Sequence, residues 1–186
     1  MSEKKERLLT PAGLAKWAHV YTPKEAFKDK NGKSQGAPKY QIDVYFSDSD
    51  PAWKDWGAKI MAYTRSKGMK NSPIKKELNE DDTPTGRFYV QFQTGEQYKP
   101  GVFDKFNQPT TELIGNDSKV VVAYNSVDYD GFGGGVKLYL NAVQVLELVP
   151  YQKHSAETYG FKSEPKPVEE KPAPGNAPPP EDDLPF

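Results

Sequence analysis

The sequence predicts a mainly β protein: an OB-like antiparallel β-barrel with one inserted helix, followed by a disordered acidic and proline-rich C-terminal tail. Three observations support this fold class. Several segments alternate apolar and polar residues with a period of two, which is typical of half-buried strands. Only the segment after Asp50 has helical spacing, and glycine-rich corners separate the strands. Short strands joined in this way favour a small closed barrel, with a β-sandwich as the alternative.

Strands are expected in five regions, namely residues 17–21, 38–46, 87–92, 119–124 and 136–149. The apolar positions expected to face the core are Tyr40, Ile42, Val44 and Phe46, then Phe88, Val90 and Phe92, and then Val136, Leu138 and Leu140. The positions expected to face outward are Gln41, Asp43 and Tyr45, then Arg87, Tyr89 and Gln91, and then Lys137 and Tyr139. In the last region the alternation slips near Asn141 and Ala142, which predicts a bulge or bend.

One helix is expected between the second and third strands. Asp50 suits the N-cap and Pro51 the first helical position, and apolar residues recur at three- and four-residue steps up to about Lys67. We assign Trp53 and Trp56 on this helix to the core. Residues 70–85 are charged and carry two prolines, so we expect a surface excursion there. Residues 101–113 are expected to form a hairpin that turns at residues 107–109.

Composition bounds the class of protein. The chain has 186 residues and no cysteine, which excludes disulfides and thiolate metal sites. The charged start is not a signal peptide and no apolar run could form a membrane helix, so we expect a soluble, cytoplasmic protein. We expect a flexible N-terminus over residues 1–10, one domain over 11–152, and a linker with the tail over 153–186. Residues 164–186 hold six acids and two lysines, net −4, which leaves 23 basic and 20 acidic residues, net +3, in the body.

Two long connections carry candidate binding residues. Residues 23–39 have a net charge of +3, and residues 125–135 are glycine-rich and present two aromatic rings. In an OB barrel such connections flank the binding groove, where lysines pair with phosphates and rings stack on the bases of a single strand. The structural alternative is that the outward tyrosines form cross-strand pairs and the lysines are simply solvated. The candidate residues for single-stranded DNA are Lys28, Lys30, Lys33, Lys39, Arg87, Tyr89, Tyr129, Phe132, Lys137 and Tyr139.

The C-terminal segment has a different chemistry. Eight of the 17 prolines lie between Glu164 and Phe186, so this segment is expected to stay disordered. It ends in three acids, an apolar pair around a proline, and a terminal aromatic ring. Carboxylates attract Lys and Arg clusters, and the ring can fill a shallow pocket beside them. We therefore expect a partner-binding hook, rather than a merely solubilising tail, formed by Glu181, Asp182, Asp183, Leu184, Pro185 and Phe186.

The sequence offers little support for catalysis. His19 and His154 are the only histidines and lie far apart in the chain. A two-metal nuclease built from Asp43, Asp104, Asp128 and Asp130 is an alternative, but their spacing demands no metal. We expect no enzyme activity, no cofactor and no metal. A β-sandwich module that binds another ligand, such as a carbohydrate, is the other alternative.

Two parts of the chain resemble known families. Residues 120–125, Tyr129 and residues 135–148 are similar to the OB-fold single-stranded DNA-binding proteins of tailed phages, and residues 38–46 resemble that family's second strand. The last six residues resemble the acidic tip of bacterial single-stranded DNA-binding proteins, with Leu184 in place of the usual isoleucine. The resemblance implies a protein that coats single-stranded DNA, without regard to sequence, in phage DNA replication, recombination and repair. It also implies a tail that recruits replication and recombination proteins, and action in the cytoplasm of a host cell.

Overall fold

The computed structural model describes residues 7–151 and Gly160. The chain divides into two compact units after Gln152, and the helices and strands of the described residues all belong to the first unit. Apart from Gly160, the predicted tail lies outside the described residues, and this includes its tip at residues 181–186. Residues 1–6 also lie outside them.

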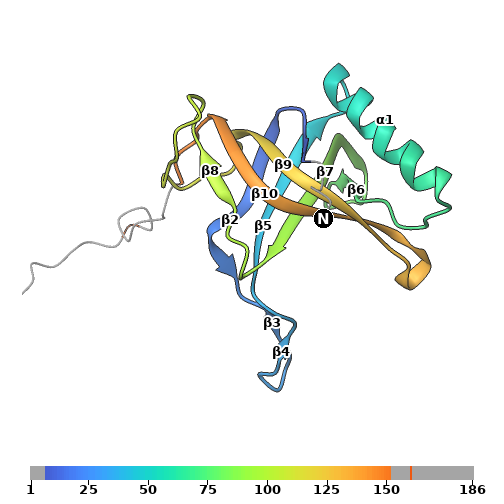
Figure 1. The fold of residues 1–186 in the computed structure, drawn as a ribbon, viewed down its shortest axis with the longest axis horizontal. Helices are drawn as coiled ribbons and strands as arrows, with labels where there is room; N and C mark the ends of the chain where they lie inside the picture. Colours follow the sequence, from blue (N-terminus) through green and yellow to red (C-terminus); the bar gives the residue numbers. More distant parts are fainter. Residues whose placement is uncertain (1–6, 152–159, 161–186) are drawn as a thin grey trace, which may run out of the picture. The chain divides into compact units, whose positions relative to one another are not determined.

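Five long strands close into a ring, in the order β2-β5-β7-β10-β9 and back to β2 (Figure 1). The ring confirms the predicted barrel and is not a β-sandwich. One detail differs from an antiparallel barrel, because β10 runs parallel to β7 where Tyr139 lies opposite Gln93. A closed ring with an odd number of strands cannot alternate direction all the way round, so one parallel pair is required. The five strands are β2 (Gly13–Lys24), β5 (Lys39–Ser47), β7 (Pro84–Gly95), β9 (Lys119–Tyr129) and β10 (Gly135–Glu147).

Shorter strands and a short 3-10 helix lie outside the five-stranded ring. A separate hairpin occupies the connection between β2 and β5 and projects from the barrel (Figure 1). β1 pairs with β9, which brings the residues just before β2 into the barrel, and β8 pairs in parallel with β10. A short 3-10 helix, Gly131–Gly133, forms the tip between β9 and β10. The short strands are β1 (Leu8–Leu9), β3 (Phe27–Lys28), β4 (Ser34–Gln35), β6 (Ile74–Leu78) and β8 (Gly101–Phe103).

Residues 70–85 lie on the surface, as predicted, but they are not simply a loop. Part of this segment forms β6, which pairs antiparallel with β7 through a turn at residues 79–83. β6 lies off the closed ring, so it can carry charged side chains while Ile74 packs against the core. A strand outside the closed ring can therefore carry the charged residues of β6, although they make its sequence look like a loop.

The core follows the predicted alternation. The inward side chains of β5 and β7 are buried, with Ile42, Val44, Val90 and Phe92 fully enclosed, except that Phe88 is partly buried and packs against the core. The outward positions of β5, including Asp43, are also buried, so this strand is covered on both faces. The bulge predicted near Asn141 is present as a register shift between Leu140 and Ala142.

The helix α1 (Pro51–Ser66) forms where the sequence predicts it. The Asp50 side chain accepts a hydrogen bond from the backbone N–H of Ala52 at 2.9 Å and caps the first turn. Trp53 is buried and stacks on Phe46 with ring centroids 4.7 Å apart. The Trp56 ring is partly buried, and its N–H donates to the Tyr124 hydroxyl at 3.0 Å. Both tryptophans thus belong to the core, as predicted.

The other predicted elements are present, but the residues at which they begin, turn or end differ from the prediction. The strand expected over residues 17–21 is longer, and Trp17 has φ 53 within a register irregularity of β2. The hairpin after β8 turns earlier than residues 107–109, because the Asp104 carboxylate accepts from the N–H groups of Phe106 and Gln108. Within the described residues, α1 lacks the length and apolar character needed to cross a bilayer, and no other helix has them.

Candidate functional site

A groove runs along the outer faces of β7 and β10. We call it the β7–β10 groove. It has a larger part of about 1100 Å³ and a smaller part of about 340 Å³, which adjoin at Gln93 and Lys137, since both residues line both parts. Where the two parts meet, Tyr139 of β10 lies opposite Gln93 of β7 in a parallel pairing. A concave surface of this size is a natural place to look for a ligand.

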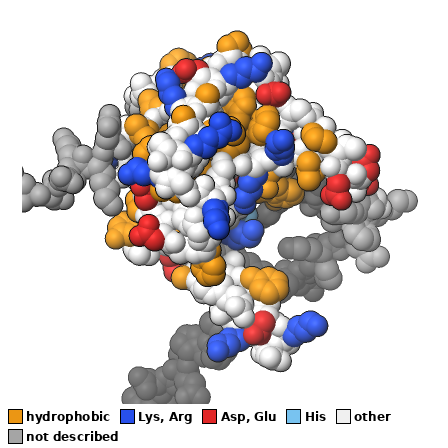
Figure 2. Space-filling model, turned by 90° about the vertical axis from the view of Figure 1, so that its right-hand side faces the viewer, with side chains coloured by type: hydrophobic (Ala, Val, Ile, Leu, Met, Phe, Trp, Pro, Cys, Tyr) orange, Lys and Arg blue, Asp and Glu red, His pale blue; other side chains and the backbone are white. Residues whose placement is uncertain are grey.

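The lining of the groove is cationic. Its two parts contain no Asp or Glu among the residues that the structure describes. On the face drawn in Figure 2, Lys and Arg side chains follow a line down the middle of the molecule, with Asp and Glu mostly toward the edges. Such a surface attracts polyanions. The cationic residues of the groove are Arg7, Lys39, Lys75, Lys99 and Lys137.

Aromatic rings lie among these cations. Tyr139 lines the larger part of the groove and Tyr129 the smaller part. The Lys137 ammonium lies over the Tyr139 ring, 5.0 Å from its centroid, so it covers one face of the ring and leaves the other face for a stacked base. Tyr98, which is exposed, also lines the larger part. Positive charge next to exposed rings is the combination that single-stranded nucleic acids require.

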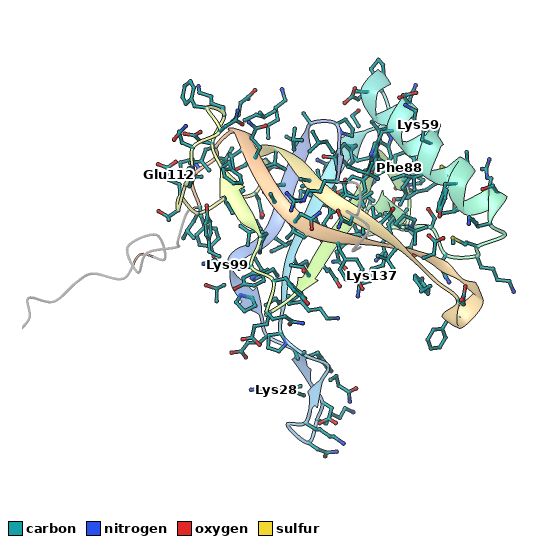
Figure 3. All side chains as sticks on the ribbon, viewed as in Figure 1. Lys28, Lys59, Phe88, Lys99, Glu112 and Lys137 are labelled. Carbon is teal, nitrogen blue, oxygen red and sulfur yellow. The ribbon has the colours of Figure 1, made fainter. Side chains whose placement is uncertain are left out.

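Two hairpins project from the barrel, and they carry several of the predicted binding residues. The connection predicted as a pliable basic loop contains the β3–β4 hairpin, on which Lys28, Lys30 and Lys33 are exposed together with Phe27 (Figure 3). The predicted aromatic loop is instead an extension of β9 and β10, with Phe132 fully exposed at its tip and φ 55. These side chains reach beyond the groove and do not line it.

Arg87 and Tyr89 contact other side chains of the protein instead of lining the groove. The Arg87 guanidinium donates two hydrogen bonds to Glu77, at 2.6 and 3.1 Å, so its charge is already matched. Burial raises the pKa of Glu77, but hydrogen bonds from Thr85 and Arg87 outweigh this and lower the pKa below its usual value. The Tyr89 ring stacks on Tyr45 across the strands, with centroids 5.0 Å apart. Neither Arg87 nor Tyr89 lines the groove.

Of the candidate residues, the structure thus brings Lys39, Tyr129, Lys137 and Tyr139 together at the groove. Sequence reasoning missed other groove residues. Tyr98 and Lys99 follow β7 in a turn, where a solvent-exposed tyrosine beside a lysine is the only local signal. Lys75 belongs to β6, a strand that the charged sequence pattern does not reveal. Other groove residues that the sequence did not identify include Arg7, Gln91, Gln93 and Gln97.

A polar ring lies beneath the centre of the groove, formed by Gln41, Asp43, Gln91 and Gln93. The amides of Gln91 and Gln41 both donate to one oxygen of Asp43, at 2.9 and 3.4 Å. The Gln93 amide donates to the carbonyl of Gln41 at 3.4 Å and to that of Gln91 at close range. Burial raises the pKa of Asp43, and the hydrogen bond from Gln91 and the charge of Lys75 partly oppose this rise.

The aspartates considered for a nuclease do not gather. No group of three or more His, Asp or Glu side chains could hold a metal ion within residues 7–151. Each of three aspartates has a local contact instead: Asp104 caps its turn, Asp128 accepts from the Tyr63 hydroxyl at 2.8 Å, and Asp43 belongs to the polar ring. The nuclease alternative therefore has no geometric support.

Comparison with known proteins identifies the fold. No protein-family model and no curated protein matches the sequence. Among solved structures, the chain is similar to gp2.5, a single-stranded DNA-binding protein encoded by bacteriophage T7. The two share 18% identity with a TM-score of 0.59, over 92% of this chain and 100% of that one. The fold is that of phage single-stranded DNA-binding proteins.

A second phage provides further matches. The C-terminally truncated single-stranded DNA-binding protein of bacteriophage Enc34 is 17% identical, with a TM-score of 0.58 over 78% of this chain and 88% of that one. The same phage protein in complex with single-stranded DNA is 16% identical, with a TM-score of 0.55 over 78% and 89%. At such identities the similarity establishes the fold, and at that level it confirms the predicted resemblance to the phage proteins.

Proposed function

We propose that this protein binds single-stranded DNA in the β7–β10 groove. The observation that carries the proposal is a groove with five cationic residues, exposed tyrosines and, among its described lining, no carboxylate. A fold shared with phage proteins that bind single-stranded DNA supports it. Lysines would pair with phosphates, while Tyr129 and Tyr139 would stack on bases for about 1–3 kcal/mol each. Phosphate pairing and stacking do not read sequence, and no bond is made or broken.

The two projecting hairpins extend this binding surface in the proposal. Lys28, Lys30 and Lys33 on the β3–β4 hairpin are exposed and would contact phosphates beyond the groove. Phe132 at the tip between β9 and β10 is fully exposed and would stack on a base. Replacing Phe132 with Ala should therefore weaken binding by about 1–3 kcal/mol and leave stability unchanged.

Binding of a labelled oligo-dT, followed by fluorescence anisotropy, tests the proposal. We expect saturable binding at low ionic strength that weakens as salt is added. An absence of binding at low salt, by protein whose fold is verified by circular dichroism, would refute the proposed function.

We further propose that the protein acts in DNA replication, recombination and repair, and that residues 181–186 recruit its protein partners. The support is the sequence of the tip, three acids followed by Leu-Pro-Phe. Deleting these six residues should leave DNA binding unchanged or slightly tighter, because their negative charge competes with DNA for cations. The same deletion should abolish capture of replication proteins. Weaker DNA binding after the deletion would contradict this role.

A further inference from the structure

The polar ring fixes the direction in which its amides point. An ionised carboxylate accepts hydrogen bonds and donates none. Asp43 therefore turns the NH₂ groups of Gln41 and Gln91 toward itself, and their carbonyl oxygens face the Gln93 amide. The register of β5 and β7 supports the arrangement, because Gln41 lies opposite Gln93 and Asp43 lies opposite Gln91.

This arrangement leaves a defined acceptor at the groove. Both N–H bonds of the Gln93 amide are used within the ring, so only its carbonyl oxygen can meet a ligand. No described residue donates a hydrogen bond to that oxygen. Gln93 lines both parts of the groove, whereas Asp43 is buried and lines neither. The ring thus presents an oriented carbonyl, backed by a buried negative charge, to whatever occupies the groove.

The position of Tyr139 makes a base the natural occupant. Tyr139 lies directly opposite Gln93 in the parallel pairing of β10 with β7. Cross-strand neighbours on one face are close enough for long side chains to share a ligand. A base stacked on Tyr139 would therefore bring its polar edge to the Gln93 carbonyl.

We propose that Gln93, oriented by the polar ring, accepts a hydrogen bond from the exocyclic amine of a base and so favours cytosine over uracil or thymine at one position. This inference rests on the proposed function and deepens it. Cytosine presents an amine at its C4 position, where thymine presents a carbonyl oxygen. A carbonyl facing that oxygen would be repulsive, and the single ring N–H of thymine is flanked by two carbonyls. Cytosine therefore gains a hydrogen bond that thymine cannot make without this repulsion.

Oligo-dC and oligo-dU of equal length test the proposal, because both are pyrimidines without the 5-methyl group and differ at the C4 amine. Mildly alkaline buffer keeps cytosine neutral. We expect oligo-dC to bind about fivefold more tightly, the equivalent of one net hydrogen bond. In Gln93→Met, which has similar size and no carbonyl, this preference should disappear while oligo-dU still binds. Gln97→Met is the matched control, since Gln97 lines the groove but makes no bond in the ring, and it should keep the preference.

A second variant tests the orientation. In Asp43→Asn the side chain can donate as well as accept, so the amides lose their fixed direction and the preference should shrink, with folding checked by circular dichroism. Equal binding of the two oligonucleotides by the unmodified protein would overturn the inference and leave the proposed function standing. A preference that survives Gln93→Met would overturn the assignment of Gln93. Failure to bind either oligonucleotide would instead refute the proposed function.

Discussion

The salt dependence of binding is the sharpest test of the groove. Five cationic residues line it. If each neutralises one phosphate, at about 0.7 per contact on a single strand, the groove alone contributes about −3.5 to the slope of the logarithm of the binding constant against the logarithm of salt concentration. Between about 50 and 200 mM salt this contribution corresponds to a loss of roughly a hundredfold in affinity. Contacts from the β3–β4 hairpin would make the total slope steeper.

Removing charges from the groove should flatten that slope. The double variant Lys39→Gln, Lys137→Gln removes two of the five groove contacts, so we expect the slope to become shallower by about 1.4. Anisotropy titrations with labelled oligo-dT over a series of salt concentrations measure both slopes. Lys119→Gln is the control, because Lys119 lies outside the groove and its ammonium is 3.4 Å from Glu147. An unchanged slope in the double variant, or an equal change in the control, would refute the assignment of phosphates to the groove.

Three other outcomes are expected. Tyr139→Ala should weaken oligo-dT binding by about 1–3 kcal/mol in the same assay, with an unchanged unfolding midpoint. Trp53→Ala should lower the free energy of unfolding by about 3–5 kcal/mol in urea titrations, because the ring is buried against Phe46 and Phe88. Burial raises the pKa of Asp43 in the folded protein, so the native state loses relative stability as pH rises from the unfolded-state pKa through the folded-state pKa. The free energy of unfolding of Asp43→Asn relative to the unmodified protein should therefore increase over that range, and a difference that stays constant or shrinks with pH would contradict the buried carboxylate.

The parts of the fold that depend on local chemistry could be predicted from the sequence. Asp50 and Pro51 define the start of α1 because capping involves only neighbouring residues. Alternation identified the inward faces of β5, β7 and β10, since a strand's two faces differ whenever one of them is buried. β6 could not be found this way. It lies off the closed ring, where charged residues are tolerated, so its pattern resembles that of a loop.

The site was only partly predictable, for a different reason. Lys137 and Tyr139 were found because outward positions of a recognised strand must lie on its surface. Tyr98 and Lys99 join the groove because the turn after β7 folds back beside β10, a placement that no local pattern encodes. The ion pair between Arg87 and Glu77 could not be predicted either, because Glu77 lies on β6, a strand that the sequence pattern does not reveal.

A buried carboxylate beneath a groove that we propose to bind a polyanion requires an explanation, and the charge distribution supplies one. Asp43 lies beneath the amides of the polar ring, and Lys75 and Lys24 are close enough to affect its pKa. The amides and lysines together reduce the repulsion that a phosphate would meet there. The negative centre still disfavours a phosphate directly over the ring, while Lys39 and Lys99, which line the larger part of the groove, favour a phosphate beside them. A strand bound in this field would keep its phosphates toward the lysines and turn its bases inward, the orientation that both stacking on Tyr139 and recognition by Gln93 require.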